Sequence, residues 1–201
     1  VSGLIALDWV NSGGGSLDGT ATVLNSFIHS GNLSGDGQLN LFGGTASFEN
    51  GSFFSGNLSI SEANATVKGG ANVSGSIDVN EAGTLEVKAG STVNLDVLRL
   101  NGGTLKGDGT IQTSNGFQWF EGTIDFNGTL RAANESAIDG DVELKGNGKL
   151  VNDAGFYWQS GSVAGGAGNP LFVNESDSNF FARSSGIWSA GTFENKGTLV
   201  K

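Results

Sequence analysis

A long internal repeat is the feature that most constrains how this chain folds. Residues 105–122 (LKGDGTIQTSNGFQWFEG) and 144–161 (LKGNGKLVNDAGFYWQSG) match without a gap at a constant offset of 39 residues. A finer step lies within this repeat, where a glycine, a threonine and an apolar residue recur at Gly83-Thr84-Leu85, Gly103-Thr104-Leu105 and Gly122-Thr123-Ile124. The finer interval is 19 to 20 residues, so the longer unit corresponds to two coils of a repeat structure.

The segments between the glycines read as short β-strands. In the segment 84–88, Leu85 and Val87 alternate with Glu86 and Lys88, which predicts a strand with one buried face. No helical stripe of apolar residues is present, and 35 glycines interrupt every stretch long enough for a helix. One coil cannot bury its apolar face, but stacked coils can. The sequence therefore predicts an all-β fold, a single right-handed parallel β-helix with coils of about 19–20 residues.

A β-sandwich built from hairpins is the structural alternative. Asn-Gly and Asp-Gly pairs suited to hairpin turns occur at Asn50-Gly51, Asn101-Gly102, Asn115-Gly116, Asn127-Gly128 and Asp139-Gly140. A sandwich, however, gives no reason for a nearly constant interval. The repeat thus favours the β-helix.

Composition narrows the functional classes. The 13 Phe and 4 Trp residues indicate a packed core rather than disorder. A net charge of −10 disfavours nucleic acid and anionic membrane surfaces as partners. No apolar stretch is long enough to insert into a membrane. The absence of cysteine excludes disulfides and thiolate metal sites.

The chain divides into two parts by its pattern. Residues 1–26 depart from the repeat and are expected to form an N-terminal cap or an exchanged strand, whereas residues 27–201 form the solenoid, with an irregular loop insertion near 162–184. The repeat continues to the last residues, so an open C-terminal coil is expected to pair with other chains. The predicted assembly residues are Leu4, Ile5, Leu7 and Leu199. The expected partner is a second copy bound head to tail, or further repeats of the same array.

Three acidic residues form the candidate metal site. Asp139, Asp141 and Glu143 alternate with apolar residues, so they are expected to share one face of a strand. Three interpretations are open: a solvated strand face, a Ca²⁺ site, or the acidic cluster of a polysaccharide-cleaving β-helix. Apart from Ca²⁺, no cofactor is indicated.

Aromatic residues form the second candidate site. Trp119, Trp158 and Trp188 are expected at equivalent positions of the repeat, where they either stack in the core or form an exposed row that binds sugar rings. The core is favoured. The single histidine, His29, cannot complete a catalytic triad or zinc site, and it is expected at a turn or on the surface.

The elements WxxGTFxNxGTL and LKGDGTI resemble the β-strand repeats of bacterial secreted β-helix proteins, which include autotransporter passengers and filamentous-haemagglutinin-like adhesins. The resemblance covers residues 83–199 and, more loosely, 27–82. It implies a right-handed coil and an extracellular or cell-surface location, and it transfers no active-site residue. The expected function is a non-enzymatic structural or adhesive surface protein, as a fibre subunit or a segment of a long adhesin. A carbohydrate-binding module that takes glycans and a polysaccharide lyase or hydrolase are the alternatives.

Overall fold

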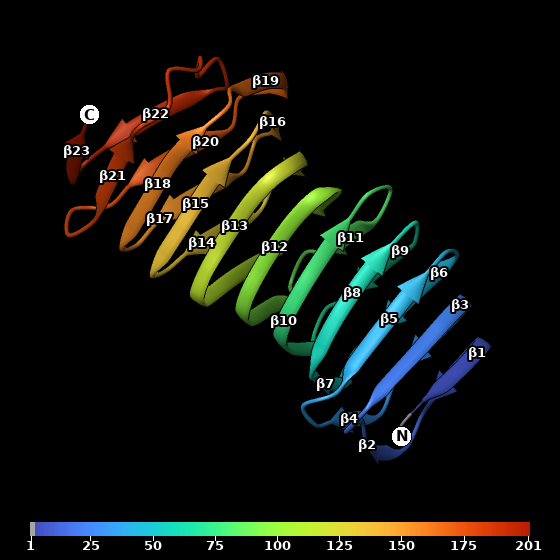
Figure 1. Cartoon of the computed structure of the whole chain (residues 1–201). Coiled ribbons are helices and arrows are strands. Elements are labelled where there is room, and N and C mark those ends of the chain that lie inside the picture. Colours follow the sequence, from blue (N-terminus) through green and yellow to red (C-terminus); the bar gives the residue numbers. More distant parts are fainter. Residues whose placement is uncertain (1–2) are drawn as a thin grey trace.

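The computed structural model describes residues 3–201 and forms one parallel β-solenoid of about ten coils (Figure 1). Every pairing between strands of this part of the chain is parallel, for example that of β12 (Thr92–Gly107) with β13 (Thr110–Phe126). The predicted stacking of coils is therefore confirmed, and the hairpin-built sandwich is not formed. Residues 3–201 contain no helix, and hence no helix able to cross a membrane.

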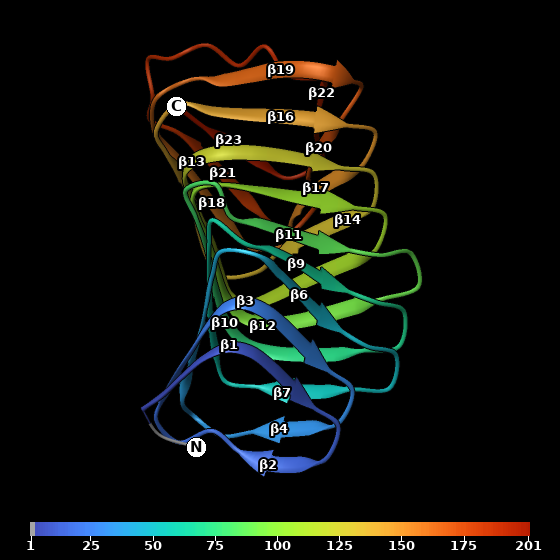
Figure 2. The ribbon, with the colours of Figure 1, turned by 90° about the vertical axis from the view of Figure 1, so that its right-hand side faces the viewer.

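Each coil has three strand positions, and equivalent positions stack into three columns, here called A, B and C (Figure 2). Column A contains β1 (Leu4–Asn11), β3 (Thr20–His29), β5 (Gln38–Phe42), β8 (Asn57–Ser61), the second part of β10 (Asn72–Asn80), β12, β13, β15 (Glu135–Asp139), β18 (Gly155–Ser160), β21 (Asn179–Ala182) and β23 (Thr198–Val200).

Column B continues the same coils around the first corner. It contains the second parts of β1 and β3, then β6 (Thr45–Phe48), β9 (Asn64–Val67), β11 (Thr84–Val87), β12, β13, β16 (Val142–Gly146) and β19 (Val163–Gly168). Column C closes each coil. It contains β2 (Gly14–Ser16), β4 (Asn32–Ser34), β7 (Phe53–Ser55), the first part of β10, β12, β13, β14 (Thr129–Ala132), β17 (Lys149–Asn152), β20 (Leu171–Asn174) and β22 (Thr192–Asn195).

The register of column B reproduces the repeat in the sequence. Leu105 pairs with Ile124, and Ile124 pairs with Leu144, so the 39-residue offset spans two coils. All three side chains are buried. Alternation along each strand sends these residues inward, where burial of a leucine or isoleucine contributes roughly 1.5–3 kcal/mol. Stacking thus joins the few apolar side chains of each coil into one continuous core.

Glycine at the corners permits this close stacking. Gly107 of the LKGDG element has a φ of 119°, and a Cβ atom there would lie 2.1 Å from the backbone oxygen of Val87 in the preceding coil. Gly146 of the matching LKGNG element has a φ of 78° and would meet Phe126 in the same way, at 2.4 Å. The repeated glycine is therefore required both by backbone conformation and by the approach of the neighbouring coil.

The structure moves the predicted domain boundaries. The limit at residue 26 falls inside β3, and residues 4–16 form the first coil of the solenoid, paired in parallel with the second coil. The expected loop insertion at 162–184 is mostly regular, because β19, β20 and β21 lie there in register with their neighbours. These coils are only longer: the paired residues Phe156 and Phe180 are 24 positions apart, compared with 19 for Leu105 and Ile124.

Candidate functional site

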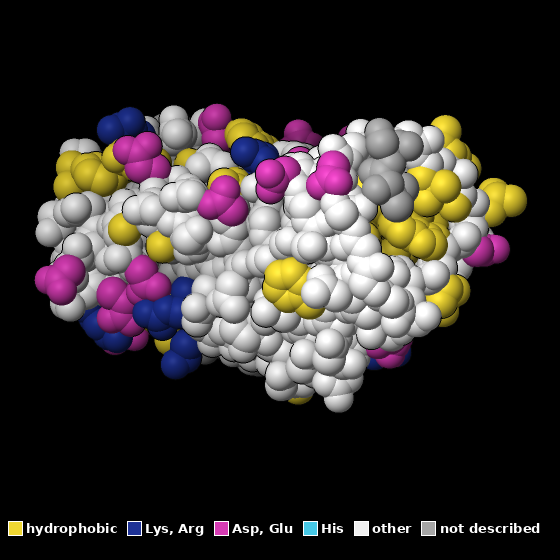
Figure 3. All heavy atoms as spheres, turned by 90° about the horizontal axis from the view of Figure 1, so that it is seen from below, with side chains coloured by type: hydrophobic (Ala, Val, Ile, Leu, Met, Phe, Trp, Pro, Cys, Tyr) yellow, Lys and Arg dark blue, Asp and Glu magenta, His cyan; other side chains and the backbone are white. Residues whose placement is uncertain are grey.

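The first coil leaves one edge of the sheet open. Among the described residues, β1 pairs only with β3, and β2 pairs only with β4. The three assembly residues predicted in this coil point in two directions, inward to the core and outward to solvent. Leu4 packs partly buried against the core, together with Trp9, whereas Ile5 and Leu7 are 73% and 69% exposed on the outside. Figure 3 shows hydrophobic side chains gathered at this end of the molecule.

The last coil leaves the opposite edge open. Among the described residues, β22 pairs only with β20, and β23 pairs only with β21. The fourth predicted assembly residue, Leu199, is 54% exposed there. It borders an apolar hollow of about 310 Å³, whose lining residues are Trp158, Phe180, Ala182, Trp188, Phe193 and Leu199. The core therefore opens to solvent at this end.

Charge is distributed unevenly between the ends. The first 67 residues contain no lysine or arginine, and their only charged residues are Asp8, Asp18, Asp36, Glu49 and Glu62. Residues 183–201, in contrast, carry Arg183, Lys196 and Lys201 with a single acidic residue, Glu194. The basic excess is confined to residues 183–201. Over the last 67 residues, 135–201, eight acidic and five basic side chains leave the C-terminal end acidic as well, so charge gives no preference for association between unlike ends.

The three candidate metal ligands do not form a cluster. Asp139 ends β15, Gly140 and Asp141 turn the corner, and Glu143 lies in β16, so the three do not share one strand. Each has its own partner: Asp139 accepts a hydrogen bond from Ser160, Asp141 accepts one from the backbone N–H of Ser162, and Glu143 pairs with Lys145. Within residues 3–201, no group of three His, Cys, Asp or Glu residues is placed to hold a metal ion. The alternation predicted a common face because the sequence does not show the corner.

The three tryptophans do not form an exposed row. Trp119 is fully buried in column A, and Trp158, two coils further along that column, is 8% exposed. A ring without exposed surface cannot stack on a sugar. Trp188 is not equivalent to them, because it bridges to Val163 of column B and packs against Trp158 with ring centroids 5.8 Å apart. The core placement favoured by the sequence is correct for Trp119 and Trp158, and the equivalence of Trp188 is wrong.

His29 is buried, contrary to its expected position at a turn or on the surface. Its Nε2 lies 2.8 Å from the backbone oxygen of Phe53, and its Nδ1 lies 3.2 Å from Nδ2 of Asn11. A carbonyl oxygen only accepts, so Nε2 carries the proton and Nδ1 accepts from the amide. Burial lowers the pKa of His29 below its ordinary value, although the bond to Phe53 raises it. This neutral ring connects the first three coils.

An asparagine ladder was not predicted from the sequence. Asn152 donates to Oδ1 of Asn174 at 2.7 Å, and Asn174 donates to Oδ1 of Asn195 at the same distance. Asn152 and Asn174 are fully buried. The signal was present in the spacing of these asparagines, which are 22 and 21 residues apart, each two positions after an apolar residue. These intervals are longer than the 19–20-residue repeat of the middle coils, so the repeat did not indicate the ladder.

The stacked coils define the protein as a β-solenoid. Compared with known proteins, the chain matches no protein-family model, and no curated protein or solved structure matches it significantly. The fold class therefore rests on the strand pairings themselves.

Proposed function

We propose that this chain is an extracellular structural or adhesive element, a rod whose first and last coils stack on further coils, either those of other copies or those of further repeats of the same array. The observation that supports this most directly is the pair of open edges, since unpaired strand edges are normally blocked or used for pairing. Exposed apolar residues at both edges favour the same arrangement. The resemblance to secreted β-helix surface proteins supports the extracellular location.

The register of the columns specifies the proposed joint. In column A, the successive pairings that start at Leu4 end at Leu199, so Leu4 of the next copy takes the position after Leu199. In column C, the series of inward residues starts at Gly15 and ends at Phe172 and Phe193. Gly15 of the next copy would then face the Phe193 ring without a side-chain clash. An unlike-end contact of this kind propagates as a filament when it does not close into a ring.

A matched pair of variants tests the association. Leu199→Glu places a charge on the open C-terminal edge, whereas Phe42→Glu makes the same change at a side chain that is 50% exposed on the outer face of the third coil. We expect sedimentation velocity and electron microscopy to show concentration-dependent filaments for the native chain and Phe42→Glu, and monomers for Leu199→Glu. Circular dichroism should show the same β-structure in all three. Monomers of the native chain at all concentrations would refute stacking on other copies.

Cysteine cross-linking tests the register, because the native chain has no cysteine. In column A the outward series starts at Ile5 and ends at Val200, so these positions of adjacent copies should be neighbours. Chains carrying Ile5→Cys and Val200→Cys should form ladders of covalent oligomers with a short bifunctional maleimide. A control with Phe42→Cys in place of Ile5→Cys should not. Equal ladders from both would contradict the register.

We also propose that the chain catalyses no reaction. The most acidic corner, at Asp139 and Asp141, has its carboxylates hydrogen bonded within the fold, and the neighbouring Glu143 is paired with Lys145. The purified chain should leave polygalacturonate and other acidic polysaccharides uncut, as measured by release of reducing or unsaturated ends. Turnover that is lost in Asp139→Asn or Asp141→Asn would contradict this proposal.

A further inference from the structure

The outward face of column A changes character along the rod. Its successive paired positions in the middle coils are Ser59, Asp78, Arg99, Gln118 and Ala137. The next two positions are Tyr157 and Phe181, whose rings stack with centroids 4.6 Å apart and an interplanar angle of 8°. Both side chains are partly exposed. Phe42 and Phe120 are exposed as well, but Tyr157 and Phe181 differ from them because their rings stack on each other on the outer face.

Arg183 completes a cationic and aromatic surface. Its guanidinium carbon lies 4.9 Å from the centroid of Tyr157 and 5.7 Å from that of Phe181. The residue is exposed, and it forms no ion pair with any residue in the described part of the chain. The rings thus hold the guanidinium in place while its N–H donors stay open to a ligand.

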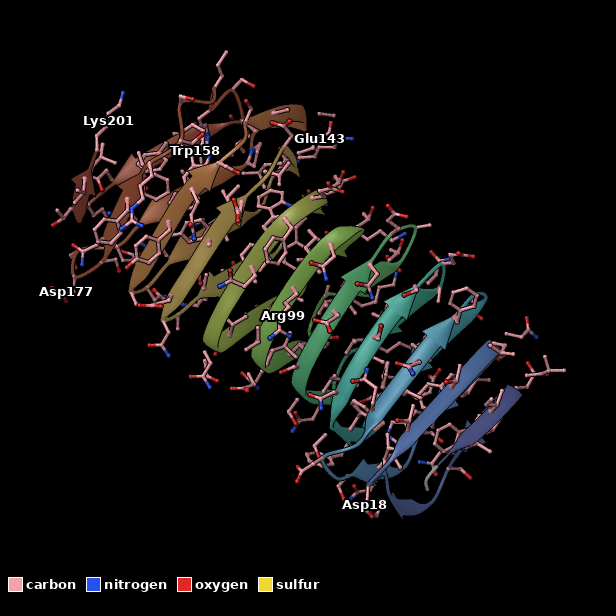
Figure 4. All side chains as sticks on the ribbon, in the orientation of Figure 1. Asp18, Arg99, Glu143, Trp158, Asp177 and Lys201 are labelled. Atoms are coloured by element: carbon pink, nitrogen blue, oxygen red, sulfur yellow. The ribbon has the colours of Figure 1, made fainter. Side chains whose placement is uncertain are left out.

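A hollow of about 680 Å³ lies beside Arg183. Its lining residues are Trp158, Ala182, Arg183, Ser184, Ser185, Gly186 and Lys201. Lys201, which extends from the end of the last coil in Figure 4, likewise has no ion pair among residues 3–201. Six of the ten cationic side chains pair with acids elsewhere on the molecule. A hollow that combines two unpaired cations is therefore unusual in a chain of net charge −10.

We propose that this surface, formed by Tyr157, Phe181, Arg183 and the adjoining hollow, binds an acidic saccharide through a sugar carboxylate. Arginine presents a planar fork that matches a carboxylate, and lysine and serine supply further donors around it. The aromatic rings provide an apolar surface for the C–H groups of a sugar ring. Tyr157 and Phe181 face outward from the rod, whereas the adjoining hollow shares Trp158 and Ala182 with the apolar hollow at the open edge, so the site borders the end-to-end joint of the proposed function.

Other ligand classes fit the surface less well. A metal ion would meet two cationic side chains and no acidic side chain among the lining residues. A nucleic acid would bring many phosphates toward a chain of net charge −10 that offers only two cations here. A neutral sugar would use the rings but would leave the cations unpaired. A carboxylated sugar uses both features.

Binding of a fluorescent tetramer of galacturonic acid to the 201-residue chain tests the proposal. We expect saturable binding that weakens as NaCl increases, and at least about a tenfold loss of affinity in Arg183→Gln, the loss of a charge-assisted hydrogen bond. Arg99→Gln is the matched control, since Arg99 lies on the same outward column but is paired with Asp78 at 3.2 Å. It should bind as the native chain does, and Arg183→Lys should bind with intermediate affinity.

Two further ligands show whether binding requires a negative charge and whether that charge is a carboxylate or a sulfate. The corresponding galactose tetramer, which lacks carboxylates, should bind at least about tenfold more weakly. If a sulfated tetrasaccharide binds more tightly than the uronate, the site recognises sulfate and not carboxylate, and the proposal is overturned. The proposal is also overturned if the uronate does not bind at millimolar concentration, or if Arg183→Gln and Arg99→Gln weaken binding equally. Arg183 is exposed, so its loss should leave the fold intact, which circular dichroism checks.

Discussion

The middle coils and the last coils solve the same packing problem in different ways. From 83 to 130 the coils are short, and aliphatic residues such as Leu85, Leu105 and Ile124 stack directly on one another. From 152 to 199 the coils are longer, and the core contains six aromatic residues and a buried asparagine ladder, compared with three buried aromatic residues, Phe117, Trp119 and Phe126, from 83 to 130. A coil enlarged by a few residues encloses more volume, and rings and paired amides fill it. Of these two regions, the one with the longer coils therefore has the more aromatic core.

The largest effect is expected from the corner glycines of the middle coils. Gly107→Ala would place a Cβ atom 2.1 Å from the backbone oxygen of Val87 at a φ of 119°. Because backbone must move, the free energy of unfolding should fall by about 3 kcal/mol or more, measured by urea unfolding. Gly90→Ala is the control, since Gly90 has a φ of 78° but open space around it. It should cost only about 1 kcal/mol, the strain of the left-handed conformation. Equal losses would show that stacking distance does not limit the middle coils.

The asparagine ladder should produce the next largest effect, because its loss unpairs buried groups in the last coils. Asn174→Ala removes the acceptor for Asn152 and the donor for Asn195. We expect a loss of about 2–4 kcal/mol in the free energy of unfolding. Thr113 stands in the same column C series, which continues through Ala132 to Asn152, and its buried hydroxyl has no hydrogen-bond partner in the described chain.

Thr113→Val is therefore the matched test in the middle coils. It removes an unpaired hydroxyl at nearly constant volume, so stability should be unchanged or rise by up to about 1 kcal/mol. A large loss from Thr113→Val, or a negligible one from Asn174→Ala, would mean that polar pairing does not distinguish the two regions. Both variants are compared with the native chain in the same urea titration.

The same contrast explains what the sequence could predict. Between 83 and 160 the short, constant interval placed Leu105 above Ile124 correctly. The predicted equivalence of Trp188 with Trp119 is wrong because Gly-Thr followed by an apolar residue occurs in all three columns: Thr123 lies in column B, Thr192 in column C and Thr198 in column A. Residues 188–199 (WSAGTFENKGTL) are therefore displaced by one column from the similar residues 119–130 (WFEGTIDFNGTL). The spacing between repeats can be measured in the sequence. The column in which a motif lies cannot, because it depends on the length of every preceding turn.

The candidate sites were harder to predict for a related reason. The acidic residues at 139–143 alternate as a strand would, but a corner at Gly140 separates them. Tyr157 and Phe181 are 24 positions apart, and only the enlarged coil brings them into register on the outer face. Arg183 follows β21 and reaches back to Tyr157 of the preceding coil. Sites on a solenoid surface combine residues from several coils, so a local pattern does not reveal them.

The smallest expected effect is a change in stability with pH. It distinguishes the His29 contacts of the first coils from the asparagine ladder of the last coils. Asparagines do not titrate, but His29 in the first coils does. Its pKa is lowered by burial from 6.5, so below pH 6.5 the unfolded chain takes up a proton that the folded chain resists. Stability from this group is therefore fully present above pH 6.5 and declines as the pH falls below that value. Protonation would also remove the acceptor at Nδ1 that Asn11 uses.

Thermal unfolding of the native chain between pH 7.5 and 5.0 should show this decline, whereas His29→Phe should lack it. Phenylalanine suits the position because Phe27, Phe48 and Phe54 surround it. Glu49 does not interfere: the hydrogen bond from Lys68 lowers its pKa below 4.5, so its contribution is lost only at lower pH. A parallel pH dependence in both chains would assign the decline to other groups. If the stability of only the native chain declines, the polar contact of the first coils depends on pH through His29. The asparagine ladder of the last coils has no such dependence, because asparagine does not titrate.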